Sequence, residues 1–490
     1  MSRPLRVLAF LGALALIAAV MAVLAMGSGS RAALRQYVAE LQAKGEKLTF
    51  EELTCDRLTN SPDTHAVIRG AARALERAGS SPSSLELRTY VGPGQAAVTW
   101  RQARPVWGKA NGPPDTRGWA ELEAQMKAAQ KTLQRLRAAL KDPAADAGPP
   151  TNMIFTRFGT RRLIRDEVRT AEVWLMGAME SDLHQGRLED ALQSLEALAG
   201  LARLGRDEPA WVDQVSRVSF ANLGLAATWE ALQAPGWTEP QLQRLQQAWA
   251  PVDLVDAVEK AFVGQRAGGY EMFAFTRRYG GAALDRLLAP NAVPASLKGR
   301  LLEFLGNYVI MPAYKLTSID RDELFYLRNM QEAITALRLL KAHRPWAEAK
   351  PRLDQVATNF HALADSTRRL RYILSTMVRP YYGRAGENAV HAETERQMAL
   401  AAIALKRFQL RHGSLPPNLE ALVPEFLPTV PHDYLSAKPL GYRLQADGSY
   451  VLYSVGDDGK DDGGDPTPLA GNFNVLWTSR DAVWPSAAGP

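Results

Sequence analysis

Cysteine is almost missing from this chain: Cys55 is the single cysteine among 490 residues. One thiol cannot form an intrachain disulfide, and it excludes zinc sites built from two or four cysteines. The sequence also lacks the GxSxG, Walker A, GxGxxG and HExxH patterns, and its seven histidines are scattered. The sequence therefore points to no reaction class, and we lean against an enzyme.

An excess of one charge is also lacking. The 58 Lys and Arg residues nearly balance the 52 Asp and Glu residues, which leaves a formal charge of +6. Both signs are interspersed along the expected helices, a pattern typical of solvated helix faces. We therefore expect no nucleic-acid partner. The hydrophobic content of 46% in 490 residues is sufficient for two or three domains with sizeable cores.

The sequence contains a single long apolar run, which lies at the N-terminus. No charged side chain occurs from Val7 to Ser30, and this length suits a helix that crosses a bilayer. Arg3 and Arg6 precede the run, so the positive-inside rule places the N-terminus in the cytoplasm and the remainder outside it. We predict a single-pass membrane anchor at residues 1–30. The alternative is a cleaved signal peptide with Val23-Leu24-Ala25 as its cleavage site, but the run exceeds a usual signal-peptide core.

Helical periodicity dominates the middle of the chain. Leu192, Leu195, Leu198 and Leu201 recur at three-residue spacing, and prolines separate successive amphipathic segments. Short connections favour antiparallel helices. We expect a helical and loop region at 31–150, which ends in an Asp142–Pro150 linker, and a helical body at 151–385. Expected helices include Trp119–Leu140, Leu188–Leu204, Val212–Leu232, Glu239–Trp249, Asp253–Ala267, Asp322–Ala342 and Arg352–Ala364.

The C-terminal part reads as a small α+β unit at 386–470, followed by a tail at 471–490. A helix is expected at Asn388–Arg411. Strands at Leu440–Leu444 and Tyr450–Val455 flank an Asp-Gly turn, which is a strong hairpin signal. The predicted fold is thus mainly α: a transmembrane helix, a body of antiparallel helices and an α+β end with a β-hairpin.

An acidic turn follows the second of these strands. It carries Asp457, Asp458, Asp461, Asp462 and Asp465 among four glycines. Carboxylates so close together repel one another unless they are solvated or share a cation, and hard oxygen ligands on a tight turn suit Ca²⁺. The turn is not an EF-hand, because a lysine stands at the second ligand position. A solvated acidic turn remains the alternative.

The order of these motifs resembles the globular domain of type II secretion major pseudopilins. The matching pieces are His412-Gly413-Ser414-Leu415-Pro416, Leu419–Pro424, Val430-Pro431-His432-Asp433, Lys438–Tyr442 and Gly448–Gly459. The resemblance implies a Ca²⁺ site with Asp458 as its best-matched ligand, followed by Asp462 and Asp465. The chain departs from the family because more than 350 residues separate the anchor from this region. As a whole it looks like large anchored bacterial proteins with a helical body, which implies the inner membrane and a periplasmic location.

His391, Glu393 and Glu395 fall close together, and His391 and Glu395 share one face of a helix, so these two could form a metal pair. We favour instead an exposed helix start with a contact between residues four positions apart. Three functions stay open on the sequence: a membrane-anchored interaction or scaffold protein with protein partners, an accessory of a pseudopilus-like secretion apparatus, or an enzyme with an unrecognised site in the helical body. The first is our prediction.

Overall fold

The computed structural model describes residues 29–54, 64–77, 85–108, 115–143, 154–281, 304–364, 367–377, 382–469 and 476–489, with residues 283, 296, 299 and 301. Side chains at 154–165 and a few residues near 365 and 380 are not described. Residues 1–28 of the predicted anchor and most of the predicted linker lie outside these ranges. Among the residues described, no helix combines the length and apolar character needed to cross a bilayer.

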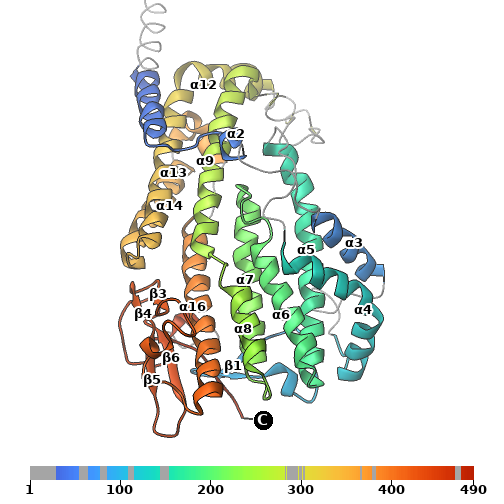
Figure 1. The fold of residues 1–490 in the computed structure, drawn as a ribbon. Coiled ribbons are helices and arrows are strands. Elements are labelled where there is room, and N and C mark those ends of the chain that lie inside the picture. Colours follow the sequence, from blue (N-terminus) through green and yellow to red (C-terminus); the bar gives the residue numbers. More distant parts are fainter. Residues whose placement is uncertain are drawn as a thin grey trace, which may run out of the picture.

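The described chain is mainly helical with small β-sheets, as the periodicity predicted (Figure 1). Residues 29–43 form its first helix. The other α-helices are α2 (Phe50–Thr54), α3 (Thr64–Arg77), α4 (Trp119–Lys141), α5 (Ile154–His184), α6 (Leu188–Arg203), α7 (Trp211–Leu232), α8 (Glu239–Trp249), α9 (Leu254–Tyr279), α12 (Met311–Thr317), α13 (Ile319–Lys341), α14 (Trp346–Ala364), α15 (Ile373–Met377) and α16 (Tyr382–His412). Short 3-10 helices are η1 (Thr99–Arg101), η3 (Thr367–Arg371), η4 (Leu419–Leu422) and η5 (Leu476–Thr478), and η2 (Gly306–Ile310) is a π-helix.

Neighbouring helices pack in chain order, α5 on α6, α6 on α7, α7 on α9, α9 on α13 and α13 on α14. The last helix, α16, packs against α7, α8, α9 and α14. Fully buried aromatic side chains, including Trp174, Trp229, Trp249 and Phe262, fill the space between these helices. The hydrophobic core is continuous from the helical body into the C-terminal strands, where it includes Leu452 and Trp484.

Helix α9 differs from its prediction. The apolar spacing predicted a helix that ends at Ala267, before Gly268 and Gly269, yet α9 continues to Tyr279. A Cβ atom on Gly269 would lie 2.1 Å from the Tyr326 ring of α13. Gly269 therefore stays in the helix because it lets the Tyr326 ring reach the α9 backbone, and packing outweighs the low helix propensity of glycine.

The strands form three small sheets. They are β1 (Thr89–Gly92), β2 (Gln95–Ala97), β3 (His432–Asp433), β4 (Lys438–Pro439), β5 (Gly441–Leu444), β6 (Tyr450–Ser454), β7 (Ala482–Val483) and β8 (Ser486–Ala487). Strands β5 and β6 make the predicted antiparallel hairpin, with Leu444 opposite Tyr450. The orders are β1-β2-β8, β3-β4 and β5-β6-β7.

The residues predicted as a C-terminal tail contribute to two of these sheets. Strand β7 pairs antiparallel with β6, and β8 pairs parallel with β2, which lies almost 400 residues earlier. Trp229 on α7 donates a hydrogen bond from its indole nitrogen to the Pro485 carbonyl at 2.8 Å. The C-terminal segment thus connects the β-hairpin, the helical body and the N-terminal region.

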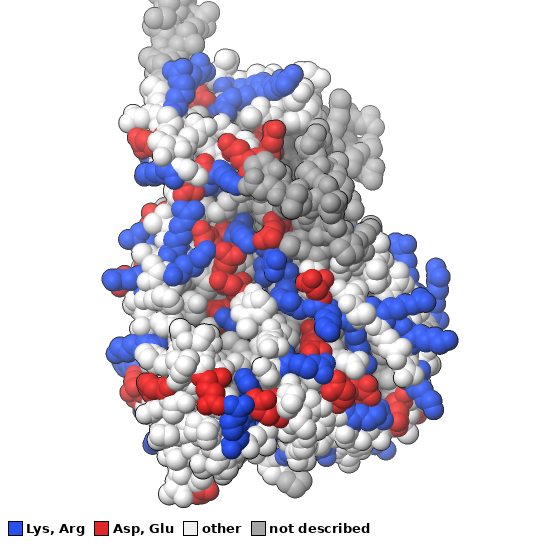
Figure 2. Space-filling model, in the orientation of Figure 1, with Lys and Arg blue, Asp and Glu red and all other residues white. Residues whose placement is uncertain are grey.

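Acidic and basic side chains alternate over the surface in Figure 2. Many of them pair across helices: Arg244 of α8 contacts Glu189 and Glu196 of α6, and Lys341 of α13 contacts Asp256 and Glu259 of α9. These partly exposed pairs connect neighbouring helices, although each contributes little to stability in water.

Candidate functional site

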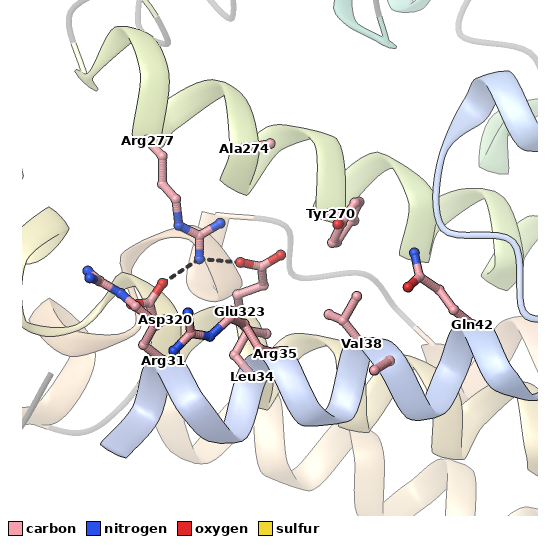
Figure 3. A pocket seen from close by; sticks show the side chains of 11 residues that line it. Arg31, Leu34, Arg35, Val38, Gln42, Tyr270, Ala274, Arg277, Asp320 and Glu323 are labelled. Carbon is pink, nitrogen blue, oxygen red and sulfur yellow. Dashed lines mark hydrogen bonds and ion pairs between the residues drawn. The ribbon is translucent and has the colours of Figure 1, made fainter. Parts of the chain in front are cut away.

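A groove of about 370 Å³ lies where the first helix packs against α9 and α13 (Figure 3). The Arg277 guanidinium sits between the carboxylates of Asp320 and Glu323, and Asp320 also accepts a hydrogen bond from Arg31 at 3.1 Å. Burial raises the pKa of Glu323 to about 7, although the attraction of Arg277 opposes that rise. The groove's charges therefore bind one another, and the cluster attaches the first helix to the body.

The predicted calcium ligand Asp458 lies on the exposed acidic turn that follows β6. Its Oδ1 accepts a hydrogen bond from the Lys460 amide at 2.9 Å. Gly456 and Gly459 flank it with φ values of 70° and 69°, a left-handed conformation that glycine adopts without strain. The turn has the tight shape that its glycines predicted, and the Asp458 carboxylate accepts a hydrogen bond from the backbone of that turn.

Asp462 and Asp465, the other two predicted ligands, lie near the Arg480 guanidinium. Arg480 lies 4.0 Å from Asp462 and 3.7 Å from Asp465. Asp465 also accepts hydrogen bonds from the hydroxyl and amide of Thr467, which lower its pKa. Among the described residues, one group of three side chains could offer metal ligands within 4.8 Å of one another. Asp458, Asp462 and Asp465 do not belong to this group.

Asp481 organises this loop, although no sequence pattern pointed to this residue. Its buried carboxylate accepts amide hydrogen bonds from Gly464 at 2.7 Å, Asp465 at 3.0 Å and Asp462 at 3.4 Å. Burial raises the pKa of Asp481 even though these three amides favour its charged form. The loop's backbone thus closes around a carboxylate from the C-terminal segment.

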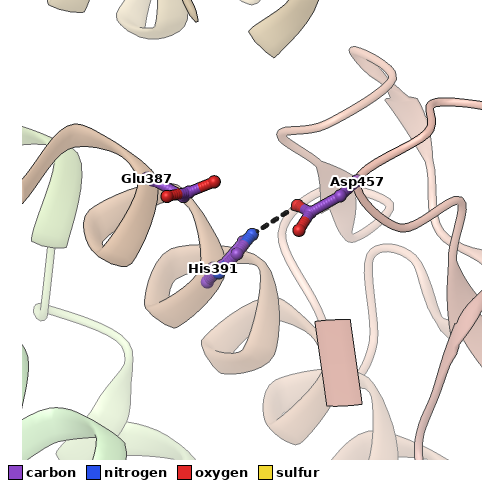
Figure 4. A group of neighbouring side chains, drawn as sticks. All are labelled: Glu387, His391 and Asp457. Carbon is purple, nitrogen blue, oxygen red and sulfur yellow. Dashed lines mark hydrogen bonds and ion pairs between the residues drawn. The ribbon is translucent and has the colours of Figure 1, made fainter. Parts of the chain in front are cut away.

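His391, Glu387 and Asp457 form the set that does come together (Figure 4). Glu387 and His391 are one turn apart on α16, and Asp457 reaches them from the acidic turn. His391 Nε2 lies 2.6 Å from Asp457 Oδ1, and one ligand atom of each residue lies within 4.8 Å of the others. One imidazole with two carboxylates is a donor set for Zn²⁺ or Mn²⁺, whereas Ca²⁺ prefers oxygen ligands alone.

The His391 ring is held in place by Trp477 of η5. The two rings stack with centroids 4.3 Å apart and planes 6° from parallel. Nε2 of the stacked ring faces Asp457, and the stacking limits rotation of the imidazole. Glu387 was missed in the sequence, although its position four residues before His391 is a detectable ligand spacing.

The favoured interpretation of His391 and Glu395 as an exposed helix start is wrong. Helix α16 begins at Tyr382, so both residues lie inside it, and Glu395 is buried. Glu395 forms an ion pair with Arg88, which precedes β1, whereas His391 contacts Asp457. Glu230 of α7 joins the same buried region by accepting the amides of Arg88 at 2.7 Å and Thr99 at 2.9 Å. Glu395 therefore attaches the N-terminal region to α16.

We expect Zn²⁺ to raise the melting temperature of the full chain in detergent through the Glu387–His391–Asp457 cluster. An ion that binds only the folded state at a hundred times its Kd stabilises by about 2.7 kcal/mol. His391→Ala should abolish this rise. The matched control is His361→Ala, which removes an exposed histidine on α14. Differential scanning fluorimetry with EDTA, Zn²⁺ or Ca²⁺ measures the effect. Equal Zn²⁺ responses in wild type and His391→Ala would contradict a site at His391.

Comparison with known proteins adds no assignment: no protein-family model, curated protein or solved structure matches this chain.

Proposed function

We propose that this chain is an interaction or scaffold protein held at the bacterial inner membrane by an anchor at residues 7–27, with its body in the periplasm. The single observation that carries the proposal is the attachment to the body of the helix that is continuous in the chain with the apolar run. This helix is described from residue 29 to residue 43, and Arg31 within it pairs with Asp320 of α13. Tyr37 lies under the Arg328 guanidinium, 5.5 Å from it. An anchor joined this closely would orient the body on the membrane.

A scaffold role is further supported by the connections between distant parts of the chain. Helix α16 packs on four helices of the body, and β8 pairs with β2. Strands β5 and β6, which precede the acidic turn in the chain, lie at the end of the molecule away from the first helix (Figure 1). Such a body would present the turn and its His391 cluster to partners at a fixed distance from the bilayer.

The second candidate is an accessory of a pseudopilus-like secretion apparatus. It is favoured by the order of C-terminal elements, in which α16, η4, the β5–β6 hairpin and the acidic turn follow one another as the motifs of major pseudopilins do. That resemblance proposes Ca²⁺ at Asp458, Asp462 and Asp465. A Ca²⁺-dependent rise in melting temperature that is lost in Asp458→Ala and retained in Asp447→Ala would support this candidate, as would neighbouring genes for a secretion ATPase.

Membrane fractionation tests the first proposal. The native protein should stay in the membrane after carbonate extraction, and its N-terminal sequence should begin at or near Met1. Protease added to spheroplasts should digest the body. A mature chain that begins near Met26 and occurs in the soluble fraction would overturn the anchor.

A further inference from the structure

One end of the molecule exposes an unusual concentration of large apolar side chains. Eight of the fifteen exposed large hydrophobic residues in the described part of the chain fall between 279 and 316. They are Tyr279, Leu301, Phe304, Leu305, Tyr308, Val309, Ile310 and Leu316. The most exposed of them are Tyr308, at 69%, and Leu316, at 66%. We call this set the apolar patch.

Most of the patch follows one face of a helical segment, whereas Tyr279 ends α9 and Ile310 lies off that face. Residues 304–317 are continuously helical through η2 and α12, and positions 301, 304, 305, 308, 309 and 316 recur at spacings near one or two turns. On the opposite face, Tyr314 is 2% exposed and donates a hydrogen bond to Asp322 at 2.6 Å. The Phe304 and Tyr308 rings lie 4.9 Å apart on the exposed side. The segment is therefore amphipathic, with its polar contact buried and its apolar face outward.

Helix α12 lies at the same end of the molecule as the start of the described first helix (Figure 1). Asp320, three residues after α12, contacts Arg31 of the first helix and Arg277 of α9. The first turn of the described first helix and the last turn of α9 therefore lie close to the end of α12. Arg278 of α9 lies over the ring of Tyr279 in the patch, and it is exposed, as are Arg31 and Arg35. Basic side chains gather along this end in Figure 2.

We propose that the apolar patch lies in the headgroup layer of the membrane, as a second contact beside the anchor. The position of the anchor in this argument rests on the proposed function. Aromatic and aliphatic side chains bordered by arginine suit the bilayer interface, where rings occupy the headgroup level and cations attract anionic lipids. A lipid surface also explains why the exposed apolar residues gather at the end where the chain leaves, rather than along the sides of the body. The contact would prevent the body from tilting about its single anchor.

The test places a fluorescent probe on the patch in the full chain. Cys55→Ser removes the native thiol, and Tyr308→Cys then carries an NBD label. The matched control label is at Leu410→Cys, which is 51% exposed near the end of α16, distant from the patch. Both proteins are reconstituted in vesicles of neutral and anionic phospholipid. We expect the label at 308 to emit at shorter wavelength and to be quenched by lipids brominated near the headgroup, and the label at 410 to behave as in water.

The outcomes separate this inference from the proposed anchor. If the chain floats with the vesicles and resists carbonate while the label at 308 stays in water, the patch proposal fails and the anchor stands. If carbonate releases the chain but the label at 308 is quenched by brominated lipid beforehand, the patch proposal stands and the anchor fails. A label that is shielded from water but not quenched by lipid, or that cross-links to a second copy, assigns the patch to a protein contact and overturns the proposal.

Discussion

Gly264→Ala should destabilise the protein by at least about 3 kcal/mol, because an added methyl group has no space there. Gly264 lies in α9, where the helix touches the backbone before α7. A Cβ atom at this position would lie 1.5 Å from the Pro209 carbonyl oxygen and 2.6 Å from its carbon. The obstacle is backbone rather than a flexible side chain, so α9 or the segment at Pro209 must shift. That shift disturbs the contact of α7 with α9 in the centre of the body.

Thermal or urea unfolding of the full chain in detergent measures the loss. The control is Gly70→Ala in α3, where nothing lies within 4 Å of the added atom. Alanine is the better helix former, so the control should gain roughly 0.5–1 kcal/mol. If Gly264→Ala and Gly70→Ala shift the midpoint alike, the close approach of α9 to Pro209 is wrong.

The free energy of unfolding should fall as pH rises from about 4.5 to about 8, and Glu172 should be a main cause. Glu172 of α5 is fully buried, and burial raises its pKa from 4.5 to about 8. Arg169 contacts Oε2 at 3.2 Å, whereas Oε1 has no hydrogen-bond partner among the described residues. The folded state therefore keeps a proton that the unfolded chain releases in this interval. Stability is highest below pH 4.5 for this group and is lost progressively up to its folded pKa.

Glu172→Gln should flatten this decline, because glutamine carries no proton to release. Each unit of pKa shift corresponds to about 1.4 kcal/mol, so the difference between pH 5 and pH 8 should amount to a few kcal/mol. Other buried carboxyls with raised pKa values, Glu180, Glu230, Asp322 and Glu323, leave a residual slope. Glu332→Gln, an exposed change on α13, should retain the wild-type slope. If the free energy of unfolding of Glu172→Gln depends on pH as strongly as that of wild type, Glu172 does not hold a proton through burial.

Features set by neighbouring residues could be predicted from the sequence. Helix α8 has the predicted bounds, and α4 ends one residue later than predicted. The Asp447-Gly448 turn produced the β5–β6 hairpin in the expected place. These elements follow from apolar spacing, caps and turn residues within a few positions of one another.

The candidate site was predicted only in part, because its contacts join distant residues. The acidic turn and His391 were both noticed, yet the sequence paired His391 with Glu395 rather than with Asp457, which lies 66 positions further on. Asp481 was missed because a single aspartate in a polar stretch has no recognisable spacing. Its role arises when β7 pairs with β6 and brings its carboxylate under the loop amides.

Short-range periodicity and turn chemistry are sufficient to predict that the chain is mainly helical, where most helices lie and that a β-hairpin precedes an acidic turn. Three features could be seen only in the folded chain: the continuation of α9 past Gly269, the pairing of the last residues with strands β2 and β6, and the carboxylates that gather around His391. Burial and side-chain packing between distant segments can override a local glycine signal, and they select partners that no local spacing specifies.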